Sequence, residues 1–131
     1  MKNRHIEMVL RVGVFGEFLG HGVFALQGKA AWLGWIQDLL PVSAETASVL
    51  LTIVGVADII TALIVLFVPI PAILLWAAAW GFWTALVRPL VGEPIWDFIE
   101  RWANWAAPLA LLLIMGTPKK LGGWFMPKRS S

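Results

Sequence analysis

The chain has 131 residues, of which 60% are hydrophobic, and its mean hydropathy is +0.80. A water-soluble domain of this length needs more polar residues to cover its core, so the composition excludes a soluble globular protein and indicates a single membrane domain over residues 1–131. Cysteine is absent, which excludes disulfides, thiolate catalysis and thiolate-bound metal or haem.

The net charge of +2 comes from basic residues in the two tails of the chain. Basic residues beside membrane spans orient the protein in the bilayer, and they do not form the basic, aromatic-lined face that nucleic-acid binding requires. We therefore expect no nucleic-acid partner. The tail residues are Lys2, Arg4, Lys119, Lys120, Lys128 and Arg129.

Four apolar segments are each long enough to cross a bilayer as a helix, which takes about 20 residues. They are residues 8–27, 46–68, 70–88 and 95–116. The first is the least apolar because it contains Arg11, Glu17 and His21, and the prolines at 69 and 71 predict a tight turn between the second and third. We predict an all-α membrane protein, a bundle of four transmembrane helices.

The direction of these spans follows from the positions of lysine and arginine. An even number of spans places both tails on one side, and the positive-inside rule makes that side cytoplasmic. Residues 28–44, whose only basic side chain is Lys29, and residues 89–94 then face outward. The first apolar segment has no small-residue cleavage site, and no targeting segment precedes it, so we expect the plasma (inner) membrane of a bacterium or archaeon.

Three ionisable residues, Glu17, His21 and Asp58, fall near the middle of the predicted spans. An intramembrane charge costs about 2.5–3.5 kcal/mol on insertion scales, so such residues need partners or water. We predict that the three handle protons at a catalytic site. The alternative is a neutral carboxyl hydrogen-bonded within the bundle. A metal site is disfavoured because only one histidine lies in the membrane, and we predict none.

A row of tryptophans follows one face of the third predicted helix. Trp76, Trp80 and Trp83 recur at i, i+4 and i+7, and Thr84 and Arg88 continue that face outward. An aromatic wall leading to a cation suits a flat apolar ligand with an anionic or carbonyl head, such as a quinone or a lipid. We predict binding by residues 80, 83, 84 and 88, with a helix-packing stripe as the alternative.

The fourth predicted helix adds two candidates to this ligand site, Glu100 and Asn104. Glu100 is equally explained as an ion pair with Arg88, and Asn104 as an interhelical hydrogen bond. In the first helix Gly16 and Gly20 form a GxxxG spacing, which predicts close helix packing either inside the bundle or in a dimer.

The chain resembles the DoxX-like family of small four-helix membrane proteins. The resemblance rests on Arg11 at the start of the first helix, the segment Phe-Leu-Gly-His-Gly at 18–22, Lys29 after that helix, Glu45 at the start of the second and Gly55 within it. It implies four spans and a membrane subunit near quinone chemistry, because some members are linked to quinone-coupled oxidation of sulfur compounds.

We therefore predict a DoxX-like membrane subunit that binds a quinone or lipid-like ligand and associates with a membrane redox complex, rather than an enzyme acting alone. Its expected partners are membrane lipids, a redox subunit and, as an open alternative, a second copy of the chain. Two other functions remain open: a small dimeric proton-coupled transporter that uses Glu17, and a structural or assembly subunit of a larger complex.

Overall fold

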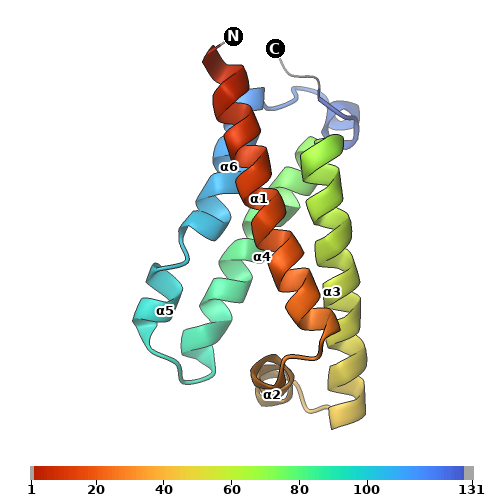
Figure 1. Ribbon diagram of the computed structural model, residues 1–131, viewed down its shortest axis with the longest axis vertical. Coiled ribbons are helices and arrows are strands. Elements are labelled where there is room, and N and C mark those ends of the chain that lie inside the picture. Colours follow the sequence, from red (N-terminus) through yellow and green to blue (C-terminus); the bar gives the residue numbers. More distant parts are fainter. Residues whose placement is uncertain (1, 129–131) are drawn as a thin grey trace.

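The structure is a computed structural model that describes residues 2–128, and within this range the chain forms helices and no strand. Figure 1 shows the helices arranged as a bundle that widens toward one end. In chain order they are α1 (Lys2–Leu26), α2 (Ala30–Leu39), α3 (Ala44–Phe67), α4 (Pro71–Leu90), α5 (Ile95–Ile99), α6 (Ala103–Met115) and the short 3-10 helix η1 (Leu121–Phe125).

Three helices in the described range are long and apolar enough to cross a membrane: α1 from Asn3, α3 and α4. They coincide with the predicted spans 8–27, 46–68 and 70–88, which confirms an all-helical membrane protein. Their outer faces are apolar, with side chains such as Val9 and Ile53 exposed, as expected where the surroundings are lipid. Of the tail residues, Arg129 lies outside the described range.

The predicted fourth span, 95–116, is interrupted. It consists of the five-residue α5 and the thirteen-residue α6, joined by a turn at 100–102. At this turn the side chain of Arg101 donates to the carbonyl of Asp97, the oxygen that the Arg101 N–H would bond in a continuous helix. The Arg101 N–H bonds the carbonyl of Phe98 instead, which tightens the chain into a turn.

The predicted outward segment 28–44 contains a helix, α2, that lies across one end of the bundle (Figure 1). Gly28, which follows α1, has φ +70°, a left-handed conformation that lets α1 end and the chain turn into α2. Ser43 then opens α3 by accepting a hydrogen bond from the Thr46 N–H at 3.1 Å. Pro71 occupies the first turn of α4, where no helical donor is needed.

Glycines set the two closest helix pairs, α1 with α3 and α4 with α6. Gly22 and Gly55 face each other, so that a Cβ on Gly22 would lie 3.1 Å from the Gly55 carbonyl oxygen. In α6, Pro108 lacks the N–H that would bond the carbonyl of Asn104, and Gly81 of α4 packs against that carbonyl. The missing side chains let these backbones approach closely.

The GxxxG pair of α1 does not take part in this packing. A Cβ on Gly16 or Gly20 would meet nothing within 4 Å, and both residues are exposed. Of the two uses predicted for this spacing, packing inside the bundle is therefore wrong.

Lys2 and Lys128, the ends of the described chain, lie at the same end of the bundle, here called the terminal end, and α2 lies at the other (Figure 1). The hydrophobic core occupies the half next to the terminal end. Its buried residues are Val14, Phe18, Ala62, Val65, Leu74, Ala77, Leu111 and Leu112.

Candidate functional site

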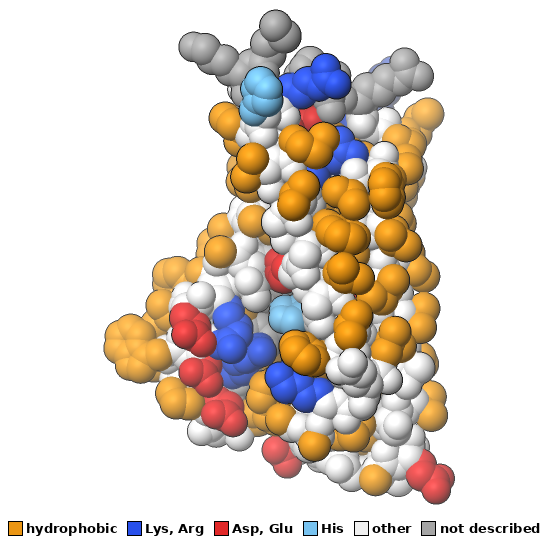
Figure 2. All heavy atoms as spheres, in the orientation of Figure 1, with side chains coloured by type: hydrophobic (Ala, Val, Ile, Leu, Met, Phe, Trp, Pro, Cys, Tyr) orange, Lys and Arg blue, Asp and Glu red, His pale blue; other side chains and the backbone are white. Residues whose placement is uncertain are grey.

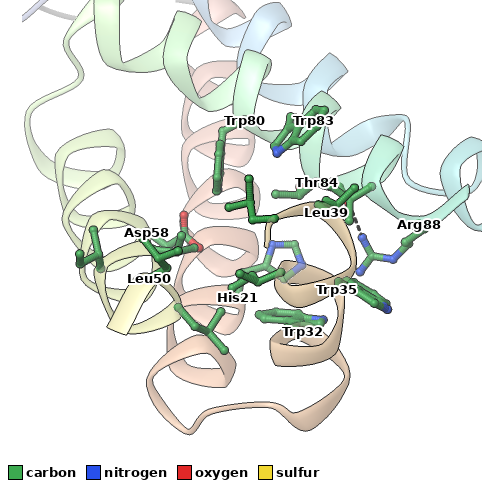
Figure 3. A pocket seen from close by; sticks show the side chains of 16 residues that line it. His21, Trp32, Trp35, Leu39, Leu50, Asp58, Trp80, Trp83, Thr84 and Arg88 are labelled. Carbon is green, nitrogen blue, oxygen red and sulfur yellow. Dashed lines mark hydrogen bonds between the residues drawn. The ribbon is translucent and has the colours of Figure 1, made fainter. Parts of the chain in front are cut away.

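In the half of the bundle next to α2, helices α1 to α4 enclose a cavity of about 500 Å³. Figure 3 shows side chains from all four helices pointing into it. A cavity of this size lies within the range of small-molecule sites in proteins. The lining residues are His21 from α1; Trp32, Trp35, Ile36, Leu39 and Leu40 from α2 and its end; Leu50, Leu51, Ile53, Val54 and Asp58 from α3; and Trp80, Trp83, Thr84, Val87 and Arg88 from α4.

Arg88 is the strongest polar feature of the cavity, with a side chain only 8% exposed. Its Nη1 donates to the Thr84 carbonyl at 2.7 Å, and its guanidinium lies 5.1 Å from the ring centroid of Trp35. Among residues 2–128 no carboxylate forms a salt bridge with it. A buried arginine with its charge unneutralised by a direct partner attracts an anionic or carbonyl oxygen.

Asp58 is the acidic residue in the cavity lining. Its side chain is 3% exposed, and its Oδ1 has no hydrogen-bond partner within the described residues. The indole of Trp80 reaches the same carboxyl. In Figure 3, Asp58 and Arg88 lie on opposite sides of the cavity, with His21 between them. A buried acceptor without a donor costs free energy, so Asp58 is a polar group that the packing of the protein itself leaves unsatisfied.

An aromatic group from α1 and α2 surrounds His21. The rings of His21 and Trp32 meet edge to face with centroids 5.7 Å apart, and Trp32 meets Phe24 in the same way at 6.1 Å. The ammonium of Lys29 lies 4.7 Å from the Phe24 ring centroid and 4.9 Å from that of Trp32. The Trp32 indole N–H is buried and donates no hydrogen bond within residues 2–128, so this half of the bundle holds an unpaired donor as well as the unpaired acceptor of Asp58.

Of the nine predicted site residues, six line this one cavity. They are His21, Asp58, Trp80, Trp83, Thr84 and Arg88. Trp76, the first tryptophan of the row, stacks on Trp80 with centroids 5.2 Å apart and lies outside the lining. The helical spacing that placed residues 80, 83, 84 and 88 on one face thus also places them on one wall.

Glu17 lies beside the cavity rather than in its wall. Its Oε1 is buried without a partner in the described chain, and its charge interacts with that of Asp58. The two carboxyls, one on α1 and one on α3, are close enough for their charges to interact, and no hydrogen bond joins them within the described residues. No three side chains among residues 2–128 form a group that would hold a metal ion.

Glu100 and Asn104 do not line the cavity. Glu100 is exposed and pairs with Arg101 at 2.5 Å, instead of with Arg88. Asn104 contributes to the α4–α6 contact through its backbone carbonyl, which faces Gly81. Figure 2 shows the acidic and basic side chains of this region gathered on the outer surface of the wide end of the bundle.

Sequence reasoning missed the contribution of α2, above all Trp32 and Trp35. Neither was among the predicted site residues, and residues 28–44 were expected to be an outward-facing segment between spans. A signal was present: Trp32, Trp35 and Ile36 recur at helical spacing in an apolar stretch of ten residues, too short to span a membrane. Such a stretch is long enough to cover a cavity.

The cavity combines apolar aromatic walls, a buried cation and an unpaired acceptor, which together suit an amphiphilic ligand of limited size. No protein-family model, characterised protein or solved structure matches this chain.

Proposed function

We propose that the protein is a DoxX-like membrane subunit that binds a quinone or lipid-like ligand in the cavity and associates with a membrane redox complex. The observation that carries this proposal is the placement of the unneutralised guanidinium of Arg88 in a cavity walled by Trp80 and Trp83. A quinone ring or a lipid head fits such a site because its carbonyl, phosphate or carboxylate oxygen accepts from the guanidinium while apolar parts contact the indoles.

The remaining polar groups fit the same kind of ligand. The Asp58 carboxyl group accepts a hydrogen bond from a ligand hydroxyl, and the Arg88 guanidinium donates to a ligand oxygen. His21 lies between them and exchanges protons with the ligand or with the Glu17–Asp58 pair. Because the chain contains no cysteine, a partner subunit holds any iron–sulfur cluster of the redox complex through its own thiolates. Arg88 argues against a cation transporter, since a fixed cation repels a cationic substrate.

We further propose that α5 and α6 together form a fourth crossing, with both termini cytoplasmic in a bacterial or archaeal plasma membrane. Both ends of the described chain lie at the terminal end (Figure 1). The positive-inside rule compares lysine and arginine on the two sides of the membrane. The terminal end carries more of them than the α2 end: Arg4, Arg11, Lys119, Lys120 and Lys128 against Lys29, Arg88 and Arg101.

Native mass spectrometry of protein released gently from its own membrane tests the ligand. We expect a retained mass of quinone or lipid size in the wild type and in Arg101→Gln, and its loss in Arg88→Gln. The two variants remove the same charge from the same end of the bundle, but only residue 88 lines the cavity. A bare protein in all three samples, or equal retention by both variants, contradicts the proposal.

A further inference from the structure

Three sides of the cavity are closed by the protein itself. Toward the terminal end, the packed core of Val65, Leu74 and their neighbours fills the space between the helices. Toward the α2 end, Trp32 and Trp35 of α2 lie across the bundle. Helix α1 closes a third side with His21. A further side of the cavity lies between α3 and α4, next to the end of α2.

Helices α3 and α4 diverge from their shared turn, as Figure 1 shows. They contact each other far less than α1 contacts α3 or α4 contacts α6. Four lining side chains are also exposed on the surface: Ile53 of α3 by 59%, Trp83 of α4 by 41%, and Leu39 and Leu40 at the end of α2 by 38% and 47%. Side chains with both properties mark an opening.

The opening is apolar, and the few polar groups of the cavity lie deeper inside it. Ile53 and Trp83 carry no charge, and both belong to helices apolar enough to span a membrane, so the opening faces lipid rather than water. The charged groups lie deeper, with Asp58 and Arg88 exposed by 3% and 8%. A solute from water would have to cross the apolar opening before reaching a polar partner, which costs free energy.

We infer that the cavity opens sideways into the lipid between α3 and α4 and admits a membrane-resident amphiphile head first, leaving its hydrocarbon chain between the two helices. This inference rests on the proposed function and narrows it: the ligand is a molecule dissolved in the bilayer, with one head that fits the cavity and an apolar tail. A quinone with its side chain and a single-chain lipid both satisfy these conditions.

The test uses a single cysteine at the opening, because the natural chain has none. Ile53→Cys is labelled with a bulky lipid-soluble maleimide in phosphatidylcholine nanodiscs, and uptake of decylubiquinone from the same bilayer is measured. The matched control is Val56→Cys, on the same helix and 47% exposed, but outside the cavity lining. The expected result is loss of uptake for labelled Ile53→Cys and unchanged uptake for labelled Val56→Cys.

The reciprocal measurement is protection. Bound decylubiquinone is expected to slow maleimide labelling of Ile53→Cys and not of Val56→Cys. Normal uptake by labelled Ile53→Cys, or no protection at position 53, overturns the sideways opening. If unlabelled protein takes up no decylubiquinone, the quinone assignment of the proposed function fails first. The same labelling test is then made with a spin-labelled single-chain phospholipid. Uptake that is blocked by the label at position 53 supports the sideways opening, and uptake that the label does not change overturns it.

Discussion

The two halves of the bundle share helices α1, α3 and α4, but α3 and α4 are packed together in one half and separated in the other. Next to the terminal end, residues such as Val14, Phe18 and Leu111 are almost completely buried and fill the space between α1, α3, α4 and α6. Next to α2, the same α3 and α4 separate and leave about 500 Å³ between tryptophans and charged groups. We call these the closed half and the open half.

The difference shows where stability and ligand binding reside. In the closed half the side chains are aliphatic or a single phenyl ring and pack against one another directly, which favours one arrangement of the helices. In the open half Asp58 Oδ1 and Trp32 Nε1 stay unpaired within the described chain, a feature that costs stability. Substitutions in the two halves should therefore affect different measurements.

The largest expected effect on stability is in the closed half. Phe18→Ala removes a ring that is 1% exposed and leaves a void between helices that refill it only in part, so the free energy of unfolding should fall by about 3–4 kcal/mol. An SDS titration of the reconstituted protein measures it. Phe67→Ala, at a phenyl ring 68% exposed to lipid, is the control and should change little. An equal fall in the free energy of unfolding for both variants would contradict the distinction between a ring packed in the core and a ring facing lipid.

The next effect concerns the α4–α6 contact at the border of the two halves. Gly81→Val places a side chain against the backbone of Asn104, 2.9 Å from its carbonyl carbon, and should destabilise the protein by about 2–3 kcal/mol. Gly20→Val is the matched change at a helical glycine with nothing within 4 Å of its Cβ. Thermal unfolding in detergent compares the two. If Gly20→Val is the more damaging, α1 uses its exposed glycines in a contact with another chain.

Arg11 provides a smaller effect at the terminal end. Its Nε donates to the carbonyl of Val65 at 3.2 Å and its Nη2 to that of Leu66, two of the carbonyls that the end of α3 leaves without helical donors. Arg11→Met should cost about 1–2 kcal/mol in the SDS titration, because a cation and its hydrogen bonds are lost at a helix C-terminus. Arg4→Met, in the exposed first turns of α1, should leave stability unchanged.

The smallest stability effect should come from the open half. Trp83→Leu removes an indole that is 41% exposed, so stability should change by less than about 0.5 kcal/mol. Decylubiquinone binding in nanodiscs should nevertheless weaken, whereas Trp96→Leu, at an indole 69% exposed and outside the cavity, should not affect binding. A large loss of stability with unchanged binding would place Trp83 among the packing residues.

The sequence alone was sufficient to predict the membrane class of the protein and three of its helices. Apolar runs 46–68 and 70–88, and the less apolar run 8–27, are long enough that their composition decides between helix and strand without tertiary contacts. Helical spacing also fixed which residues share a face, and so it placed Trp80, Thr84 and Arg88 on one wall. These are local properties, because each depends only on neighbours within one segment.

The tertiary structure decided what those faces meet. At the break near Glu100 and Arg101 the two side chains pair with each other and Arg101 bonds the Asp97 carbonyl, details that hydropathy does not register. The role of α2 depends on its position across the end of the bundle, and the separation of α3 from α4 depends on the glycine contacts that hold each to another helix. Contacts between segments set these features, so composition and spacing within a segment could not predict them.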